Sequence, residues 1–304
     1  MSGNQEFKMD GKKLRAYKGS GGDVVVPDGV IKICAYAFED CAALTRVTIP
    51  EGVEVIDVRA FQNCTGLTEV VLPSSLREID SSAFVGCTSL TQVAIPEGIT
   101  KISWNVFQNC AGLKQVTLPK GLTAIRAAAF AGCTSLTEID LPDSVAEIGQ
   151  QAFWGCSSLT KFTIPKQVSF HNWNGTGYNV FVGCLNLKDL RVAEGSPNLT
   201  AEGGVLYSQD RTVLIAWPGA EGHVELPATV TRLSSEAFTG CTGLTSLTIP
   251  SQVESDVRSD QLINGCAFAG CVNLTQFQVA PEHPTLYAQD GALYRRTKDG
   301  PVLV

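Results

Sequence analysis

The chain has 304 residues, of which 17% are charged and 44% are hydrophobic, and its formal net charge is −7. This apolar content is enough for a folded core, so the composition excludes a disordered chain, and an acidic chain without a long basic run is unsuited to binding nucleic acid. No apolar run reaches the roughly 18 residues of a transmembrane helix, so we expect no membrane insertion.

The N-terminal residues, MSGNQEFKMDGKK, lack the apolar stretch of a signal peptide. Residues 7–19, FKMDGKKLRAYKG, predict a β-hairpin around Asp10 and Gly11. We expect residues 1–26 to form a cap that covers the apolar end of the structure that follows.

Residues 27–192 contain a regular repeat. The unit from Leu67 reads LTEVVLPSSLREIDSSAFVGC, and the unit from Leu90 reads LTQVAIPEGITKISWNVFQNC. Five successive cysteine spacings between Cys41 and Cys156 are 23 residues. A fixed period of this length predicts a solenoid, which is a single elongated body however long it grows.

Each unit predicts one coil of that solenoid. The segment L-x-x-V-x-I is short and β-branched, which favours a strand, and the proline after it ends the strand. A Gly or Ser then marks a turn, and V-x-x-I begins a short return strand. The A-F-x-x-C segment is too short for a stable free helix, and we expect it to form one helical or 3₁₀ turn.

These patterns resemble a known family. The L-x-x-L-x-L core matches leucine-rich repeats, and I-P-x-x-V-x-x-I-x-x-x-A-F-x-x-C is similar to the BspA-like leucine-rich repeat family. The resemblance implies a right-handed solenoid of the α/β repeat class, mostly β, with a parallel concave sheet and short return strands. Commoner leucine-rich repeats carry an Asn or Cys after the strand, which is absent here, so we expect proline and glycine to set the corner.

The repeat is interrupted further along the chain. Residues 193–226 predict an inserted β-hairpin, because VLY and VLIAW flank the polar segment SQDRT. Repeats resume over residues 227–280, and residues 281–304 predict a C-terminal hairpin that stops partway through a unit. The whole chain, residues 1–304, is thus expected to be one solenoid.

A phenylalanine precedes a cysteine by three residues in nine units. Disulfides are disfavoured because the 11 cysteines are an odd number and stacked side chains point the same way. Zinc is disfavoured because no C-x-x-C is present and the three histidines are scattered. We therefore predict buried Phe and Cys ladders, in which a Cys110→Ser hydroxyl would have no partner and would cost about 1–3 kcal/mol. The pairs are Phe38/Cys41, Phe61/Cys64, Phe84/Cys87, Phe107/Cys110, Phe130/Cys133, Phe153/Cys156, Phe181/Cys184, Phe238/Cys241 and Phe268/Cys271.

No catalytic motif is recognisable, so we predict a protein that is not an enzyme and uses neither a metal nor another cofactor. A glycosidase-like pair of carboxylates, such as Glu69 and Glu138, is a remote alternative. What remains is the surface, where exposed strand positions vary in size and charge while the core positions stay constant. The candidate partner-binding residues on strands are Arg46, Glu69, Gln92, Gln115, Glu138, Lys161, Asp189, Asp140 and Arg191.

Aromatic residues supply a second set of candidates, because exposed rings often anchor interfaces. Packing of the same rings over a loosened coil is the alternative. The set contains Trp104, Trp154, His171, Trp173 and Tyr178.

The family resemblance implies a bacterial surface or secreted protein for adhesion and host-protein binding, with a protein partner such as a host extracellular or matrix protein. A cytoplasmic interaction scaffold is the alternative if Met1 is the true start. We expect a monomer in either case.

Overall fold

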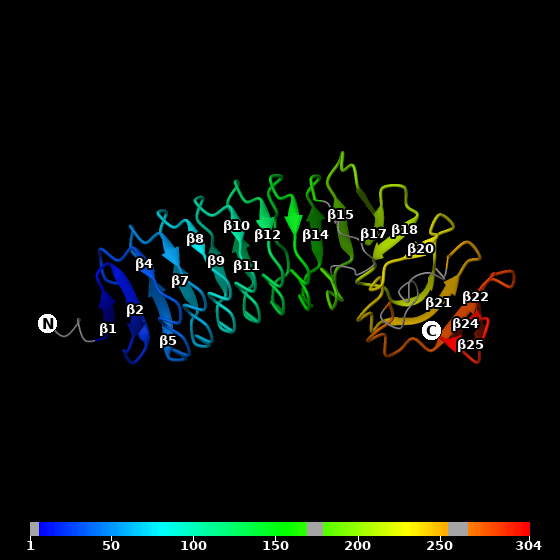
Figure 1. Ribbon diagram of the computed structural model, residues 1–304, viewed down its shortest axis with the longest axis horizontal. Helices are drawn as coiled ribbons and strands as arrows, with labels where there is room; N and C mark the ends of the chain where they lie inside the picture. The colour runs from blue at the N-terminus through cyan, green and yellow to red at the C-terminus, as the bar shows by residue number, and fades with distance from the viewer. Residues whose placement is uncertain (1–5, 169–178, 255–266) are drawn as a thin grey trace.

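The computed structural model describes residues 6–168, 179–254 and 267–304. Successive coils follow one another along the long axis and form an elongated, curved array, with the N-terminus and the last strands at opposite ends (Figure 1). Within the described residues every regular element is a strand, and no helix is present. The predicted solenoid is confirmed.

Most coils contribute one strand to the same side of the solenoid, and these strands pair in parallel. They form a five-stranded sheet and, beyond the segment 136–141, a two-stranded sheet, which together are called the main sheet. Arg46 lies opposite Glu69, and Glu69 lies opposite Gln92, so each coil is offset from the next by one repeat. The segment 136–141 is not a strand, yet Leu136 and Ile139 stay buried. The strands are β3 (Gly22–Val25), β5 (Leu44–Thr48), β7 (Glu69–Val71), β9 (Gln92–Ala94), β11 (Gln115–Thr117), β14 (Lys161–Ile164) and β15 (Asp189–Val192).

The return side of the coils carries strands of two residues. Ile33 pairs with Ile56, and Ile56 pairs with Ile79, so the buried isoleucines stack in the same register as the main sheet. Because the chain turns on both sides of V-x-x-I, these strands cannot lengthen. They are β4 (Lys32–Ile33), β6 (Val55–Ile56), β8 (Glu78–Ile79), β10 (Lys101–Ile102), β12 (Ala124–Ile125) and β13 (Glu147–Ile148).

The A-F-x-x-C segments are successive turns, and the predicted helical or 3₁₀ turn is wrong. In one coil the N–H groups of Ser82 and Phe84 donate to carbonyls of the next coil, at 2.8 and 2.9 Å, whereas those of Ala83 and Val85 donate three residues back, at 3.2 and 3.1 Å. Ser82 has φ 60°, and Gly86 has φ 74°. Left-handed residues on both sides of the phenylalanine break any helix, while the alternating bonds still satisfy the main chain.

The phenylalanines form a ladder along the core. From Phe38 to Phe153 successive ring centroids lie 4.7–5.6 Å apart, with interplanar angles of 2–14°. Each ring in this run is fully buried. The predicted phenylalanine ladder is confirmed.

The cysteines form a second ladder beside the first. The thiol of Cys64 donates to the carbonyl of Phe38 at 3.0 Å, and the thiol of Cys87 donates to the carbonyl of Phe61 at 3.2 Å. The same contact recurs in later coils, for example from Cys133 to Phe107 at 3.2 Å. Every cysteine of the described residues is a free thiol. From Cys64 onwards the ladder thiols are buried as predicted, and each of them also has a main-chain acceptor that the sequence did not indicate. Cys41, the first of the ladder, is only partly buried.

Hydroxyl groups help to hold the corners, where proline and glycine alone had been expected. The hydroxyl of Thr68 donates to the carbonyl of Thr45 at 2.9 Å, and that of Thr91 donates to the carbonyl of Thr68 at 3.4 Å. At the Gly/Ser position, the Ser75 hydroxyl donates to Val53 at 2.8 Å and accepts the N–H of Gly52 at 2.9 Å. These bonds join adjacent coils in place of an asparagine ladder.

Antiparallel strands lie at both ends and in the middle of the array. At the N-terminus β1 (Phe7–Asp10) pairs with β2 (Lys13–Tyr17), and β2 pairs in parallel with β4. At the C-terminus β23 (Leu286–Gln289), β24 (Ala292–Thr297) and β25 (Gly300–Leu303) form a meander.

The middle segment is also a meander, of β16 (Leu199–Glu202), β17 (Val205–Ser208) and β18 (Val213–Ala216), and β18 pairs in parallel with β20 (Arg232–Leu233). The second main sheet follows, with β19 (Gly222–Glu225), β21 (Leu244–Ile249) and β22 (Gln276–Val279). The buried core divides at this meander into a cluster that ends at Leu206 and another that begins at Val205. The division of the chain at residues 193–226 stays a prediction.

Candidate protein-binding surfaces

The outward face of the main sheet holds the strand candidates in two columns. Arg46 and Glu69 are adjacent in the first column and form an ion pair of 2.9 Å. Lys161 and Asp189 are adjacent further along, and Asp189 also pairs with Arg191 at 2.5 Å. The register therefore aligns Arg46, Glu69, Gln92 and Gln115 in the five-stranded sheet, and Lys161 with Asp189 in the two-stranded sheet.

The centre of this face is uncharged. Gln92 and Gln115 lie opposite one another on β9 and β11, and both are exposed. Beside them Val71 is 38% exposed, and Ala94 and Thr117 are exposed small residues. A neutral, low-relief centre with charged groups towards the ends is the arrangement of many protein interfaces, whose cores are depleted of charge.

Glu138 and Asp140 are exposed but belong to the segment that is not a strand. Their column position follows Gln115, so Glu69 and Glu138 are three coils apart, roughly 14 Å at a strand spacing of about 4.8 Å. Paired glycosidase carboxylates need separations of about 5–9.5 Å. This distance argues against the carboxylate-pair alternative for these two residues.

Two of the aromatic candidates, Trp104 and Trp154, lie elsewhere, on the return side and its turns. Trp104 is 53% exposed and Trp154 is 46% exposed. The guanidinium of Arg126 lies 5.6 Å from the Trp104 ring centroid and forms an ion pair with Glu147. Exposed tryptophans are uncommon, and a stacked arginine holds the first ring in place.

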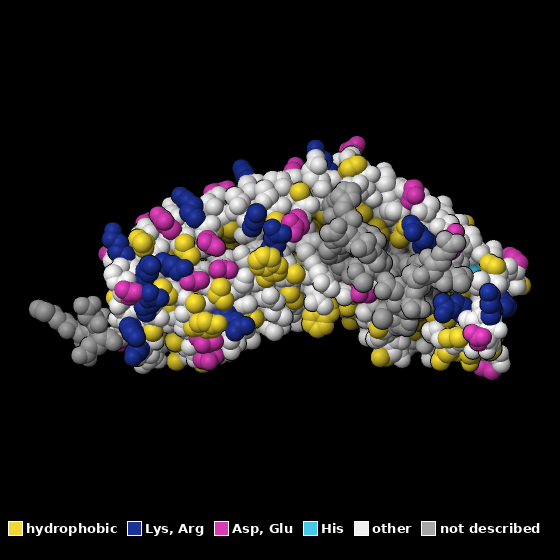
Figure 2. All heavy atoms as spheres, viewed as in Figure 1, with side chains coloured by type: hydrophobic (Ala, Val, Ile, Leu, Met, Phe, Trp, Pro, Cys, Tyr) yellow, Lys and Arg dark blue, Asp and Glu magenta, His cyan; other side chains and the backbone are white. Residues whose placement is uncertain are grey.

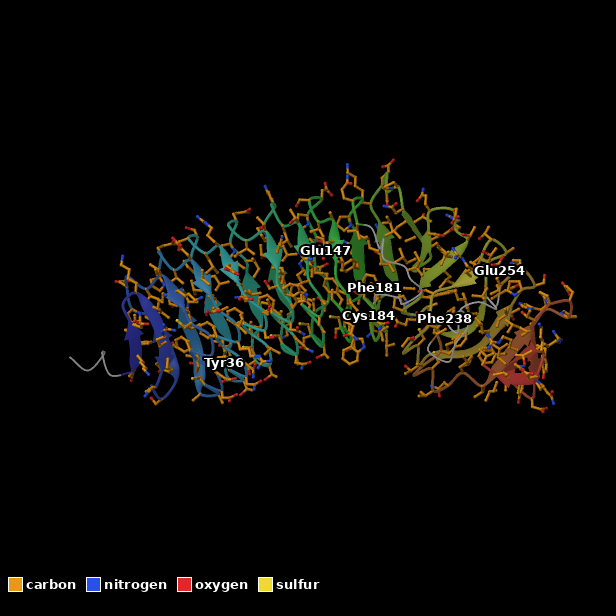
Figure 3. All side chains as sticks on the ribbon, viewed as in Figure 1. Tyr36, Glu147, Phe181, Cys184, Phe238 and Glu254 are labelled. Atoms are coloured by element: carbon orange, nitrogen blue, oxygen red, sulfur yellow. The ribbon has the colours of Figure 1, made fainter. Side chains whose placement is uncertain are left out.

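Tyr36 is a further aromatic residue of this side, and the sequence analysis did not single it out. Its ring is 48% exposed, and the Arg59 guanidinium lies 5.9 Å from the ring centroid. Tyr36 and Glu147 both lie on the face turned to the viewer (Figure 3), where positive and negative side chains are interspersed (Figure 2). The remaining predicted residues, His171, Trp173 and Tyr178, lie outside the described residues.

Burial suppresses the chemistry of the thiols. It raises the pKa of Cys110 and of Cys156 to about 12, and that of Cys41 to about 11. Because the thiolate is the reactive form, these groups are poor nucleophiles and poor metal ligands. No group of three His, Cys, Asp or Glu side chains in the described ranges could hold a metal ion, and no helix there is long and apolar enough to cross a membrane.

One carboxyl group departs from this picture. Burial raises the pKa of Glu236 to about 7, although the main-chain N–H of Asn179 opposes the shift. The Oε2 atom of Glu236 and the Oδ1 atom of Asn179 are both buried without a hydrogen-bond partner. The two residues come from coils on either side of the middle meander, so this is a polar defect at the junction between the two core clusters.

Parallel coils, stacked phenylalanines and a sheet face of variable polar residues define a leucine-rich repeat solenoid. The chain belongs to the BspA type leucine rich repeat region family, whose model matches residues 16–133, 100–202 and 222–288. The family resemblance found in the sequence is thereby confirmed. Leucine-rich repeat proteins generally have no catalytic activity and act in protein interactions.

Several bacterial proteins of solved structure are similar to this chain. A leucine rich cell surface protein from Faecalibacterium prausnitzii is 22% identical, with a TM-score of 0.53 over 93% of this chain and 94% of that one. The pneumococcal vaccine antigen PcpA is 20% identical, with a TM-score of 0.55 over 89% of this chain and 66% of that one. The leucine rich repeat protein of T. pallidum is 30% identical over 62% of this chain and 80% of that one, with a TM-score of 0.42. No curated protein matches the chain.

Proposed function

We propose that this chain is a non-catalytic binding protein that recognises another protein through the outward face of its main sheet. The observation that carries the proposal is the contrast between positions in one register. The buried columns repeat Leu, Val and Phe, while the exposed column changes from Arg46 to Glu69 to Gln92. A constant scaffold with a varied face is how repeat proteins present a recognition surface.

We further propose that the protein acts at a bacterial surface or after secretion, in adhesion or in binding to a host protein. One support is a similar structure described as a leucine rich cell surface protein. A cytoplasmic scaffold remains the second candidate, favoured by the free thiols of the described residues.

The test compares two matched pairs of substitutions. Gln92→Arg with Gln115→Arg adds two positive charges to the centre of the sheet face. Gln150→Arg with Gln151→Arg adds the same charge at exposed positions on the return turns. The parent and both variants are used as bait in extracellular matrix extract and in cell lysate, and bound proteins are quantified by mass spectrometry.

We expect a reproducible partner whose capture falls at least about tenfold with the sheet-face variant and is retained by the return-turn variant. Capture from matrix supports the adhesion role, and capture from lysate alone supports the scaffold. Equal capture by all three proteins would overturn recognition through the sheet face.

A further inference from the structure

His283 is a buried histidine at the start of the meander of β23, β24 and β25. Only 2% of its surface is exposed, and both ring nitrogens have main-chain partners. The N–H groups of Thr285 and Leu286 donate to Nδ1 at 3.2 and 3.0 Å. Nδ1 is therefore the acceptor nitrogen, and the ring hydrogen is on Nε2, which donates to the carbonyl of Val253 at 2.9 Å.

This ring joins two parts of the fold. Val253 is a buried residue in the turn after β21, and Leu286 is the buried first residue of β23. Arg296 of β24 adds a second link, because its Nη1 atom donates to the carbonyls of His283 and Leu286, both at 2.9 Å. The neutral imidazole thus connects the coil that contains β21 to the β23–β25 meander.

The meander in the middle of the chain has the same local arrangement, with a serine in place of the histidine. The sequences S-P-N-L, residues 196–199, and H-P-T-L, residues 283–286, both end at the first residue of a strand. The Ser196 hydroxyl oxygen accepts the N–H of Leu199 at 3.3 Å, as Nδ1 of His283 accepts that of Leu286. Both meanders therefore begin with a side-chain acceptor, but of the two only the histidine takes up a proton near neutral pH.

Protonation of the ring would break these contacts. An imidazolium carries hydrogens on both nitrogens, so Nδ1 would be a donor facing two N–H groups. Burial lowers the pKa of His283 from 6.5, and the charge of Arg296 acts in the same direction, while the bond to Val253 opposes both. Glu254 and Glu282, which adjoin the bonded residues in the chain, are exposed, and β21, β22 and β23 contain no charged residue that could neutralise the ring.

We propose that His283 is an acid-sensitive switch, and that its protonation releases the β23–β25 meander from the coil that contains β21. The meander is docked while the ring is neutral, and the charged ring reaches water only after the meander opens. Opening exposes Leu286 and Leu293, which are buried in the second core cluster. The switch is separate from the sheet face, so the proposal stands whether or not that face binds a partner.

The direction of the pKa shift sets the pH range of the switch. Because the pKa of His283 in the folded chain lies below 6.5, the open state binds more protons than the docked state as the pH falls through 6.5. Docking is therefore complete above pH 6.5 and weakens below it. With one proton taken up, the equilibrium constant for opening rises by up to about tenfold for each pH unit.

The test is amide hydrogen exchange of the full chain, followed by NMR from pH 7.5 to 5, with each rate divided by the intrinsic rate at the same pH. The Leu286 amide is the reporter, and the Leu199 amide, bound to Ser196, is the internal control. His283→Asn is the matched variant, because the asparagine Oδ1 can accept the same N–H groups but does not titrate. The ¹⁵N shifts of the His283 ring in the parent chain report its protonation directly.

We expect protection of the Leu286 amide in the parent to fall between about fivefold and thirtyfold from pH 7.5 to 5, while that of Leu199 does not fall. In His283→Asn the protection of Leu286 should stay constant. Constant protection in the parent, or an equal fall in the variant, would overturn the proposal. If the variant does not fold, the ring shifts decide, because a ring that becomes charged while Leu286 stays protected would overturn it as well.

Discussion

The thiol of Cys110 donates a hydrogen bond to the carbonyl of Phe84 in the preceding coil, across 3.2 Å. The same carbonyl accepts the N–H of Cys87 at 3.2 Å, so one oxygen joins two neighbouring coils. A serine hydroxyl at position 110 would find this acceptor. We therefore expect Cys110→Ser to cost about 1 kcal/mol or less, below most of the range expected for an unpartnered hydroxyl. Urea unfolding measures the cost, and a loss above about 3 kcal/mol would show that the shorter side chain does not reach Phe84.

The reactivity of the Cys110 thiol should also show that this side chain is buried. Burial raises the pKa of Cys110 to about 12, so at pH 8 almost no thiolate is present, and the side chain is inaccessible. We expect Cys110 to resist a thiol reagent in the native protein and to react fully in concentrated urea. Cys41, which is only partly buried, is the internal comparison and should react sooner on partial unfolding. Peptide mapping by mass spectrometry resolves the sites, and rapid native labelling of Cys110 would contradict a closed core.

The phenylalanine ladder should be sensitive to a single gap. Phe107 lies between Phe84 and Phe130, with ring centroids 5.6 and 5.5 Å away. Phe107→Ala removes the ring that stacks on both neighbours and leaves a cavity. We therefore expect the free energy of unfolding to fall by about 3–5 kcal/mol. Phe107→Leu keeps most of the volume and should cost clearly less. Chemical denaturation compares the two. Equal losses would mean that the lost ring stacking, which is common to both variants, sets the cost and that the cavity volume matters little.

Part of this structure could be predicted from the sequence alone. A period of 23 residues was enough to predict the strands, their parallel register and the two ladders, because stacking forces equal positions into contact. The sequence left open whether Trp104 and Trp154 are exposed or packed over a coil, and in the structure they are 53% and 46% exposed. The Arg126 contact could not be predicted, because it joins different columns of adjacent coils. The hydroxyl ladder was missed because threonine is equally common at unbonded exposed strand positions.

The left-handed backbone conformation around the ladder phenylalanines was also not predicted from the sequence. Position Phe+2 holds Asp40, Asn63, Gly86 and similar residues, which suit a left-handed φ and could have been recognised. Position Phe−2 holds Tyr36, Arg59 and Gln151 in the same conformation, with φ of 62°, 55° and 57°. Such side chains give no signal of a left-handed residue. The stacking of the coils imposes that conformation. Because the side chains do not indicate it, the sequence predicted a helical turn at this position.

The strain at Phe−2 leads to a matched pair of glycine substitutions. Gln151 is exposed with φ 57°, so Gln151→Gly removes the left-handed penalty of about 1–2 kcal/mol and adds about 0.5–1 kcal/mol of chain entropy. We expect a net gain of about 0.5–1 kcal/mol. Gln150 is its exposed neighbour without a positive φ, and Gln150→Gly should lose about 0.5–1 kcal/mol. Thermal and urea unfolding of both variants measure the contrast, and shifts of the same sign would refute the strain.

Glu236 should give the protein a distinct pH dependence. Burial raises the pKa of this carboxyl from 4.5 to about 7, so between these pH values the folded state holds a proton that the unfolded state releases. Stability from this group is present below pH 4.5 and is lost as the pH rises to about 7. Glu236→Gln keeps the shape without the charge. The variant should therefore gain on the parent through this window and keep a constant advantage above it.

The measurement is the urea midpoint of parent and variant at several pH values from 4 to 9, and the difference between the two midpoints is the quantity of interest. Its dependence on pH isolates Glu236, because every other titrating group is common to both proteins. The Oε2 atom of Glu236 has no partner in the folded chain, so the Asn179 N–H offsets only part of the cost of burying the ionised form. If the difference between the urea midpoints is constant from pH 4 to 9, the pKa of this carboxyl is not raised by folding. The carboxyl would then be hydrated at the junction, and the two coils would pack less closely there than other coils do.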